Sequence, residues 1–90
     1  MTMAQIIYTD GLTKAVTPKN GTDFQLDELK AIVGGYIEIV ETIDGRLLVL
    51  DEEGKLKDKP INMKATRLYK QGMFDFIVGD VLVCETDEIK

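Results

Sequence analysis

The sequence predicts an α+β domain, with a mostly antiparallel sheet of about five strands and two helices on one face. Two Asp-Gly pairs, at 10–11 and 44–45, each separate two short apolar stretches, which is the pattern of a β-hairpin. By contrast, the stretches 26–33 and 61–69 have apolar residues at helical spacing. The 90 residues therefore form a single domain, 1–90, with the element order β-β-α-β-β-α-β.

The first predicted hairpin joins the strands Gln5–Tyr8 and Leu12–Thr17. The Asp-Gly pair between them supplies the positive φ angles of a tight hairpin turn. Pro18 ends the second strand because proline has no N–H to donate to a neighbouring strand. The polar loop 19–23 and an expected core residue, Phe24, then lead to the first helix.

The first helix is predicted over Leu26–Val33, and its apolar stripe consists of Leu26, Leu29, Ile32 and Val33. Acidic residues at 27 and 28 suit the positive end of the helix dipole. Gly34 follows the last apolar residue and is expected to end the helix in the left-handed conformation. Either Gln25 or Asp23 is the N-cap, because glutamine is a poor cap compared with aspartate.

The second predicted hairpin joins a strand within Tyr36–Thr42 to the strand Leu47–Leu50. The first of these alternates apolar and polar residues. The second is apolar throughout, which predicts an interior strand that is covered on both faces. A turn rich in acid, Asp51–Gly54, and an exposed basic piece, Lys55–Lys59, follow it.

The second helix is expected to begin at Asn62, a favourable N-cap, and to stop near Gly72. Its apolar stripe comprises Ile61, Ala65, Leu68 and Tyr69. The stretch Phe74–Cys84 reads as one bent strand or two short ones, with Gly79 at a bulge or turn. We expect a frayed tail over Glu85–Lys90.

The composition narrows the classes of function. The chain has a net charge of -5, no histidine and one cysteine, Cys84. Acidic charge disfavours non-specific nucleic-acid binding, and a lone cysteine excludes an internal disulfide and suits the reducing cytoplasm. The start Met1–Gln5 lacks the features of a signal peptide, and no apolar run approaches the ~20 residues of a membrane helix.

No catalytic or cofactor site is predicted. The pair Gly34-Gly35 follows a helix and opens a strand, whereas phosphate-binding loops follow a strand and open a helix. The acidic residues Asp44 and 51–53 do not have the spacing of a Ca²⁺ loop. Cys84 lies in an apolar strand with no histidine to activate it. We therefore expect no enzyme activity, no metal and no cofactor.

Four blocks of the sequence, in the same order, resemble one small domain family. The blocks are Val33–Val40, Asp51–Leu56, Pro60–Asn62 with Ala65-Thr66, and Ile77–Val83. Over residues 26–84 the sequence resembles the domain of unknown function 3846 family, and Gln25 departs from it where a capping Thr or Ser is expected. The resemblance implies a gene of a bacteriophage, prophage or bacterial mobile element and a bacterial cytoplasm. It implies no established activity.

The leading hypothesis is a non-enzymatic interaction module that binds a host or element-encoded protein. Its docking surface is predicted on the segment Asp51–Asn62 and the adjacent helix, and its residues are Glu52, Glu53, Lys55, Lys57, Lys64 and Arg67. Loops held on a rigid scaffold are where binding residues collect. The alternative interpretation of this segment is a solvated connection with no partner.

Two other functions stay open. One is a small-ligand binding or sequestering protein with a pocket beside the segment 51–62. The weaker one is a nucleic-acid-associated accessory protein that uses the basic helix face. Asp80 lies between apolar residues, and it is either a turn residue that accepts backbone N–H groups or an acid that faces a ligand. We expect a monomer or a weak homo-oligomer.

Overall fold

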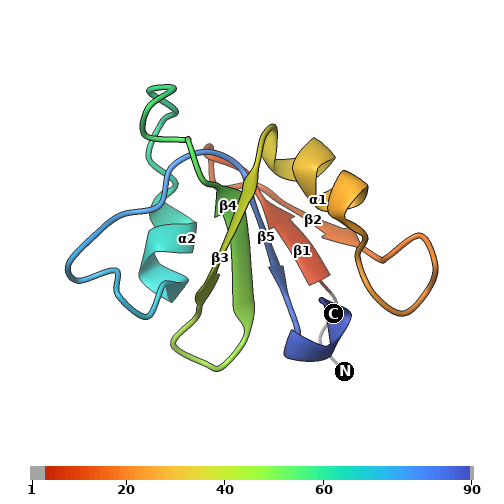
Figure 1. The fold of residues 1–90 in the computed structure, drawn as a ribbon. Coiled ribbons are helices and arrows are strands. Elements are labelled where there is room, and N and C mark those ends of the chain that lie inside the picture. Colours follow the sequence, from red (N-terminus) through yellow and green to blue (C-terminus); the bar gives the residue numbers. More distant parts are fainter. Residues whose placement is uncertain (1–3, 90) are drawn as a thin grey trace.

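The computed structural model describes residues 4–89, in which a five-stranded antiparallel sheet has the strand order β2-β1-β5-β4-β3 (Figure 1). The strands are β1 (Ala4–Ile7), β2 (Thr13–Val16), β3 (Ile37–Glu41), β4 (Leu47–Asp51) and β5 (Val81–Cys84). The helices are α1 (Leu26–Val33), α2 (Met63–Leu68) and the short 3-10 helix η1 (Thr86–Glu88). The predicted α+β class, strand number and element order are confirmed. Met1–Met3, part of the start examined for a signal peptide, and Lys90 lie outside the described residues.

The last strand in the sequence is the central strand of the sheet. β5 pairs with β1 on one side and β4 on the other, and both pairings are antiparallel. All four residues of β5 are buried, and in β4 the residues from Leu48 onward are buried too. The prediction that Leu47–Leu50 forms an interior strand covered on both faces is therefore confirmed.

The two helices pack on opposite faces of the sheet, so the predicted placement on one face is wrong (Figure 1). Successive residues of a strand point to opposite faces. In β5, Leu82 and Cys84 pack in the cluster that contains α1, whereas Val81 and Val83 pack in the cluster that contains Ala65 of α2. Interior strands that are apolar at every position require cover on both faces.

Helix α1 has the predicted bounds. The Glu28 carboxylate accepts hydrogen bonds from the N–H groups of Gln25, at 2.8 Å, and Lys19, at 2.9 Å. The N-cap is therefore Gln25, the first of the two residues considered. Gly34 ends the helix with a φ of 83°, in the left-handed region that was predicted.

Helix α2 is shorter than predicted and stops at Leu68, not near Gly72. The chain leaves the helix to pair with the end of β3. The N–H of Ile43 donates to the Leu68 carbonyl at 2.8 Å, and the N–H of Lys70 donates to the Glu41 carbonyl at 3.0 Å. These bonds replace the next helical turn, which the apolar spacing alone did not reveal.

The stretch Phe74–Cys84 is neither one bent strand nor two short strands. Only Val81–Cys84 is a strand, and the preceding residues form a loop with one isolated bridge between Ile61 and Val78. Gly79 has a φ of 79°, as expected for a turn.

The described part of the C-terminal tail is ordered by contacts. Residues 86–88 form η1, and the Glu88 carbonyl accepts a hydrogen bond from Phe24 N–H at 2.7 Å. The predicted fraying is therefore wrong over 85–89, since this segment closes the end of the core beside α1.

Candidate functional site

Asn62 is a fully buried polar residue that joins α2 to the sheet. Its side-chain amide donates to the carbonyls of Ile7 and Gly79, both at 2.9 Å, and its oxygen accepts from Ala65 N–H at 3.1 Å. The expected N-cap is confirmed. The same side chain also ties the start of α2 to the end of β1 and to the turn before β5, so it is a structural residue.

Asp80 lies beside this junction. Its carboxylate accepts a hydrogen bond from Thr9 N–H at 3.0 Å, just beyond the end of β1. This bond agrees with the interpretation of Asp80 as a turn residue that satisfies a backbone donor. The side chain does not line the cleft described below.

Asp51 ends β4 with a side chain that is only 1% exposed and carries two lysine partners. The Nζ atoms of Lys57 and Lys59 each lie 2.8 Å from its carboxylate. Burial by itself would raise the pKa of Asp51, but hydrogen bonds from the two lysines and from Glu53 N–H outweigh it and lower the pKa to about 2.

The two lysines also hold the end of α1. Lys59 donates to the Val33 carbonyl at 2.7 Å, and Lys57 donates to the Gly34 carbonyl at 3.3 Å. Cations suit the C-terminal end of a helix, where the last carbonyls lack helical partners. A Cβ on Gly35 would lie 2.6 Å from Lys57 Nζ, so the Gly34-Gly35 pair makes room for this clamp. Lys57 is therefore part of the structural framework.

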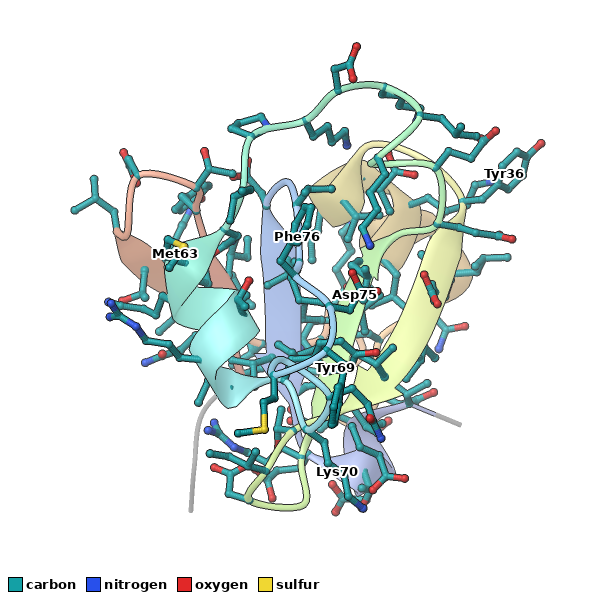
Figure 2. The ribbon with its side chains drawn as sticks, turned by 90° about the vertical axis from the view of Figure 1, so that its left-hand side faces the viewer. Tyr36, Met63, Tyr69, Lys70, Asp75 and Phe76 are labelled. Atoms are coloured by element: carbon teal, nitrogen blue, oxygen red, sulfur yellow. The ribbon has the colours of Figure 1, made fainter. Side chains whose placement is uncertain are left out.

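A cleft of about 260 Å³ opens on the α2 side of the sheet, between β3, β4 and the segment 69–78. We call it the central cleft. Tyr69 and Phe76 contribute aromatic side chains, and Figure 2 shows both of them, with Asp75, between α2 and β3. The remaining apolar lining is Val40, Leu50, Ile77 and Val78, and the charged lining is Glu38, Asp51, Glu52, Lys55 and Asp75.

The central cleft is lined by more acidic side chains than basic ones. Lys55 forms an ion pair with Asp75, and its Nζ lies 4.8 Å from the centroid of the Phe76 ring. The hydrogen bond from Lys55, with a second from Phe76 N–H, lowers the pKa of Asp75. Glu38 and Glu52 have no ion-pair partner within residues 4–89. The cleft thus carries an excess of negative charge.

Two shallower hollows adjoin the central cleft. The β3-side hollow, of about 320 Å³, shares Val40 and Tyr69 with it and is otherwise lined by Ile39, Glu41, Leu47, Lys70 and Gln71. The loop-side hollow, of about 290 Å³, shares Lys55, Phe76 and Val78 and is otherwise lined by Asp58, Lys59 and Ile61. Tyr69 lines both the central cleft and the β3-side hollow, and Phe76 lines both the central cleft and the loop-side hollow. We call the central cleft and the two hollows together the groove.

The loop beside the groove exposes large apolar side chains. Met73 is 90% exposed and Phe74 is 84% exposed. The loop is anchored at its far end, because Ile77 N–H donates to Thr66 Oγ1 at 2.9 Å. Exposed aromatic and methionine side chains next to a hollow are typical of protein-binding surfaces.

Comparison with known proteins places the chain in a family. The family model described as Domain of unknown function (DUF3846) matches residues 4–90. The chain belongs to this family. No curated protein and no solved structure gives a significant match.

In this DUF3846 domain the predicted docking residues do not form one site. Glu52 and Lys55 line the central cleft, whereas Lys57, together with Lys59, pairs with the buried Asp51. Lys64 donates to the Gly11 carbonyl at 2.9 Å, which directs it toward the β1–β2 turn. Glu53 is half-buried and Arg67 is exposed on α2, and neither lines the groove.

Sequence reasoning missed Glu38, Tyr69, Asp75 and Phe76 as groove residues. The run Met73–Phe76 leads into the stretch Phe74–Cys84, which the sequence predicts as strand because residues 76–78 and 81–84 are apolar. The sequence does contain a signal for a loop here, because the run follows Gly72 directly and places Asp75 between its two phenylalanines.

The other chemical features of the DUF3846 domain are structural. Cys84 is 1% exposed, and burial, with some contribution from nearby acidic residues, raises its pKa to about 12. Asp44 pairs with Arg46 at the β3–β4 turn, at the opposite end of β4 from Asp51. Residues 4–89 contain no cluster of three or more metal-ligating side chains and no helix with the length and apolarity needed to cross a bilayer.

Proposed function

We propose that this DUF3846 domain is a non-enzymatic interaction module that binds a protein through the groove and the neighbouring loop 71–76. The observation that carries the proposal is the row of three adjoining hollows with Tyr69 and Phe76 between them. Aromatic side chains are enriched where protein interfaces gain most of their energy. Hollows separated by rings offer separate sites for successive side chains of a partner.

The loop beside the groove supports the same function. Met73 and Phe74 expose most of their apolar surface to water, and burial by a partner would be favourable by about 25 cal/mol per Å². The loop begins at the bridge between Thr42 and Tyr69, beside the end of β3, and ends at the hydrogen bond between Ile77 and Thr66 of α2, so it is held at both ends. A surface held in this way loses little conformational freedom on binding.

The proposal of a non-enzymatic role is supported because the side chains that a catalysed reaction would require are missing, buried or already hydrogen-bonded. The sequence contains no histidine. The Cys84 thiol is buried with a raised pKa, which opposes formation of a nucleophilic thiolate. Asp51 is engaged by lysines and Asp80 by a backbone N–H.

The proposed biological setting is a phage or mobile genetic element acting in the bacterial cytoplasm. This setting rests on the family resemblance. A single buried cysteine agrees with a reducing compartment.

A small-ligand binding or sequestering function is the second candidate. The central cleft supports it, because charged groups converge on an apolar floor there. Its volume of about 260 Å³ lies just below the ~300 Å³ at which ligand pockets begin. Mass spectrometry of small molecules released from the purified domain by denaturation tests this candidate.

Capture from a bacterial lysate tests the protein-binding proposal. The bait is compared with the double variant Met73→Ser/Phe74→Ser and with the control Leu12→Ser, whose side chain is 66% exposed in the distant β1–β2 turn. We expect a protein that is captured by the unmodified domain and by Leu12→Ser but is lost with the double variant. Capture that is equal for all three baits contradicts the proposal.

A further inference from the structure

We propose that the groove binds an extended segment of a protein, and that a lysine or arginine side chain of this segment enters the central cleft in place of Lys55. This inference deepens the proposed protein-binding function and rests on it. The shape of the groove, the charge of the central cleft and the position of Lys55 each contribute to the argument.

The shape of the groove favours an extended segment. The β3-side hollow joins the central cleft at Tyr69, and the loop-side hollow joins it at Phe76. A compact small molecule would occupy one hollow. In an extended chain, by contrast, residues two positions apart point the same way at a spacing of about 7 Å, which suits neighbouring hollows on either side of a ring.

The charge of the central cleft favours a cation. Glu38 lies directly opposite Leu50 in the β3–β4 pairing, and Glu52 follows two residues later on the same face. The backbones of these two residues are therefore diagonal neighbours, about 7–8 Å apart, and both side chains line the same cleft as Asp75. A cation between them supplies the ion-pair partner that Glu38 and Glu52 each lack within residues 4–89.

Lys55 shows which chemistry the cleft accepts. Its ammonium group contacts a carboxylate and an aromatic ring, Asp75 and Phe76, as a partner's basic side chain would. Both members of the ion pair are about half exposed, at 51% and 47%, so the pair contributes little stability. A second cation with better access to Glu38 and Glu52 therefore displaces Lys55 at low cost.

The loop-side hollow specifies a neighbouring residue of the segment. Its apolar lining comprises Ile61, Phe76 and Val78, which suits an apolar side chain. The preferred segment thus carries a basic residue two positions away from an apolar residue, in an extended conformation.

The test is an NMR titration of the ¹⁵N-labelled domain with two capped pentapeptides. One has the sequence Ser-Lys-Ser-Leu-Ser, and in the other norleucine replaces lysine, which removes the ammonium group and keeps the apolar stem. We expect the lysine peptide to shift the amide signals of Glu38, Tyr69 and Phe76 and to bind roughly fivefold more tightly than the norleucine peptide. Equal affinity of the two peptides overturns the proposal.

Three variants locate the effect. Glu38→Gln/Glu52→Gln should weaken binding of the lysine peptide several-fold, whereas Asp27→Asn/Asp87→Asn, with the same change of net charge but no groove residue, should leave it nearly unchanged. Lys55→Met removes the internal cation and should strengthen binding. Equal losses for both double variants, or weaker binding by Lys55→Met, contradict the inference.

A third probe separates the source of the cation. Spermidine that binds more tightly than the lysine peptide overturns the choice of a protein segment in favour of a free amine. If capture depends on Met73 and Phe74 but neither peptide shows a charge preference, the proposed protein-binding function stands and this inference fails. A charge preference without loop-dependent capture contradicts the proposed function, on which this inference rests.

Discussion

Replacement of Asn62 by alanine should destabilise the domain by about 3 kcal/mol. The side chain is 0% exposed and makes three hydrogen bonds, to Ile7, Gly79 and Ala65. Loss of an N-cap costs about 1 kcal/mol. Two buried carbonyls that each lose a hydrogen-bond donor add about 1 kcal/mol each, the lower end of the cost of an unsatisfied buried polar group.

The companion variant Asn62→Asp separates the cap from the two donors. An aspartate keeps an oxygen for Ala65 N–H but turns a second oxygen toward the carbonyls of Ile7 and Gly79. At pH 7 its loss should equal or exceed that of Asn62→Ala, because the charge is buried and faces acceptors. Burial raises the pKa of this carboxyl in the folded state, so the loss should shrink as the pH falls and the protonated acid donates one hydrogen bond.

Urea denaturation followed by circular dichroism measures both variants against the parent domain at pH 7 and near pH 4.5. A loss of 3 kcal/mol corresponds to roughly 10–20 °C in Tm for a domain of this size. Gln71→Ala is the control, because this loop residue is exposed and its side chain forms no hydrogen bond within residues 4–89. The free energy of unfolding of this variant should stay within about 0.5 kcal/mol of the parent value. A loss below about 1 kcal/mol for Asn62→Ala, or full stability of Asn62→Asp at pH 7, refutes the reasoning.

Four further predictions concern stability and reactivity. Gly34→Val should cost more than ~1 kcal/mol because φ is 83° there, while Gly34→Asn should cost less, and equal denaturation midpoints would contradict this. Lys59→Met should destabilise by about 1–2 kcal/mol, since it breaks a contact of buried Asp51, whereas Lys64→Met should be nearly neutral by the same assay. Because the pKa of Asp51 is lowered to about 2, its carboxylate stabilises the folded domain above pH 4, and this stabilisation is lost as the pH falls toward 2. Asp51→Asn should therefore flatten the dependence of the unfolding free energy on pH in this range. Cys84 should stay unreactive toward a thiol reagent at pH 8 until urea unfolds the domain, and rapid native labelling would disprove its burial.

The element order and the hairpins follow from local signals. The Asp-Gly pairs mark two turns, and the Leu26–Val33 periodicity defines a helix that ends at Gly34, as the structure confirms. Each of these features depends on residues within a few positions of one another. Backbone preferences at that range are set before the chain has any tertiary contact, and for this reason they can be predicted from the sequence.

The groove depends on contacts between distant residues. Helix α2 ends at Leu68 because the chain there forms hydrogen bonds with the end of β3 and the β3–β4 turn. Ile43 N–H donates to the Leu68 carbonyl, and the Glu41 carbonyl accepts from Lys70 N–H. The same pairing brings Tyr69 over the edge of the sheet, where it meets Phe76 and Glu38 around one cleft. No local pattern of residues contains this information.

Sequence alone determined the fold class, the order of the elements, both hairpin turns, the bounds of α1 and the capping role of Asn62. The tertiary structure decided that the helices cover opposite faces, that Lys57 clamps Asp51, and that Glu52 and Lys55 share a cleft with Asp75. The continuous apolar runs of β4 and β5 already required cover on both faces, but they did not say which helix provides each cover. Charged side chains such as those of Lys55, Lys57 and Lys64 have the same preferences in the sequence, and their different roles arise only from the groups that folding places within their reach.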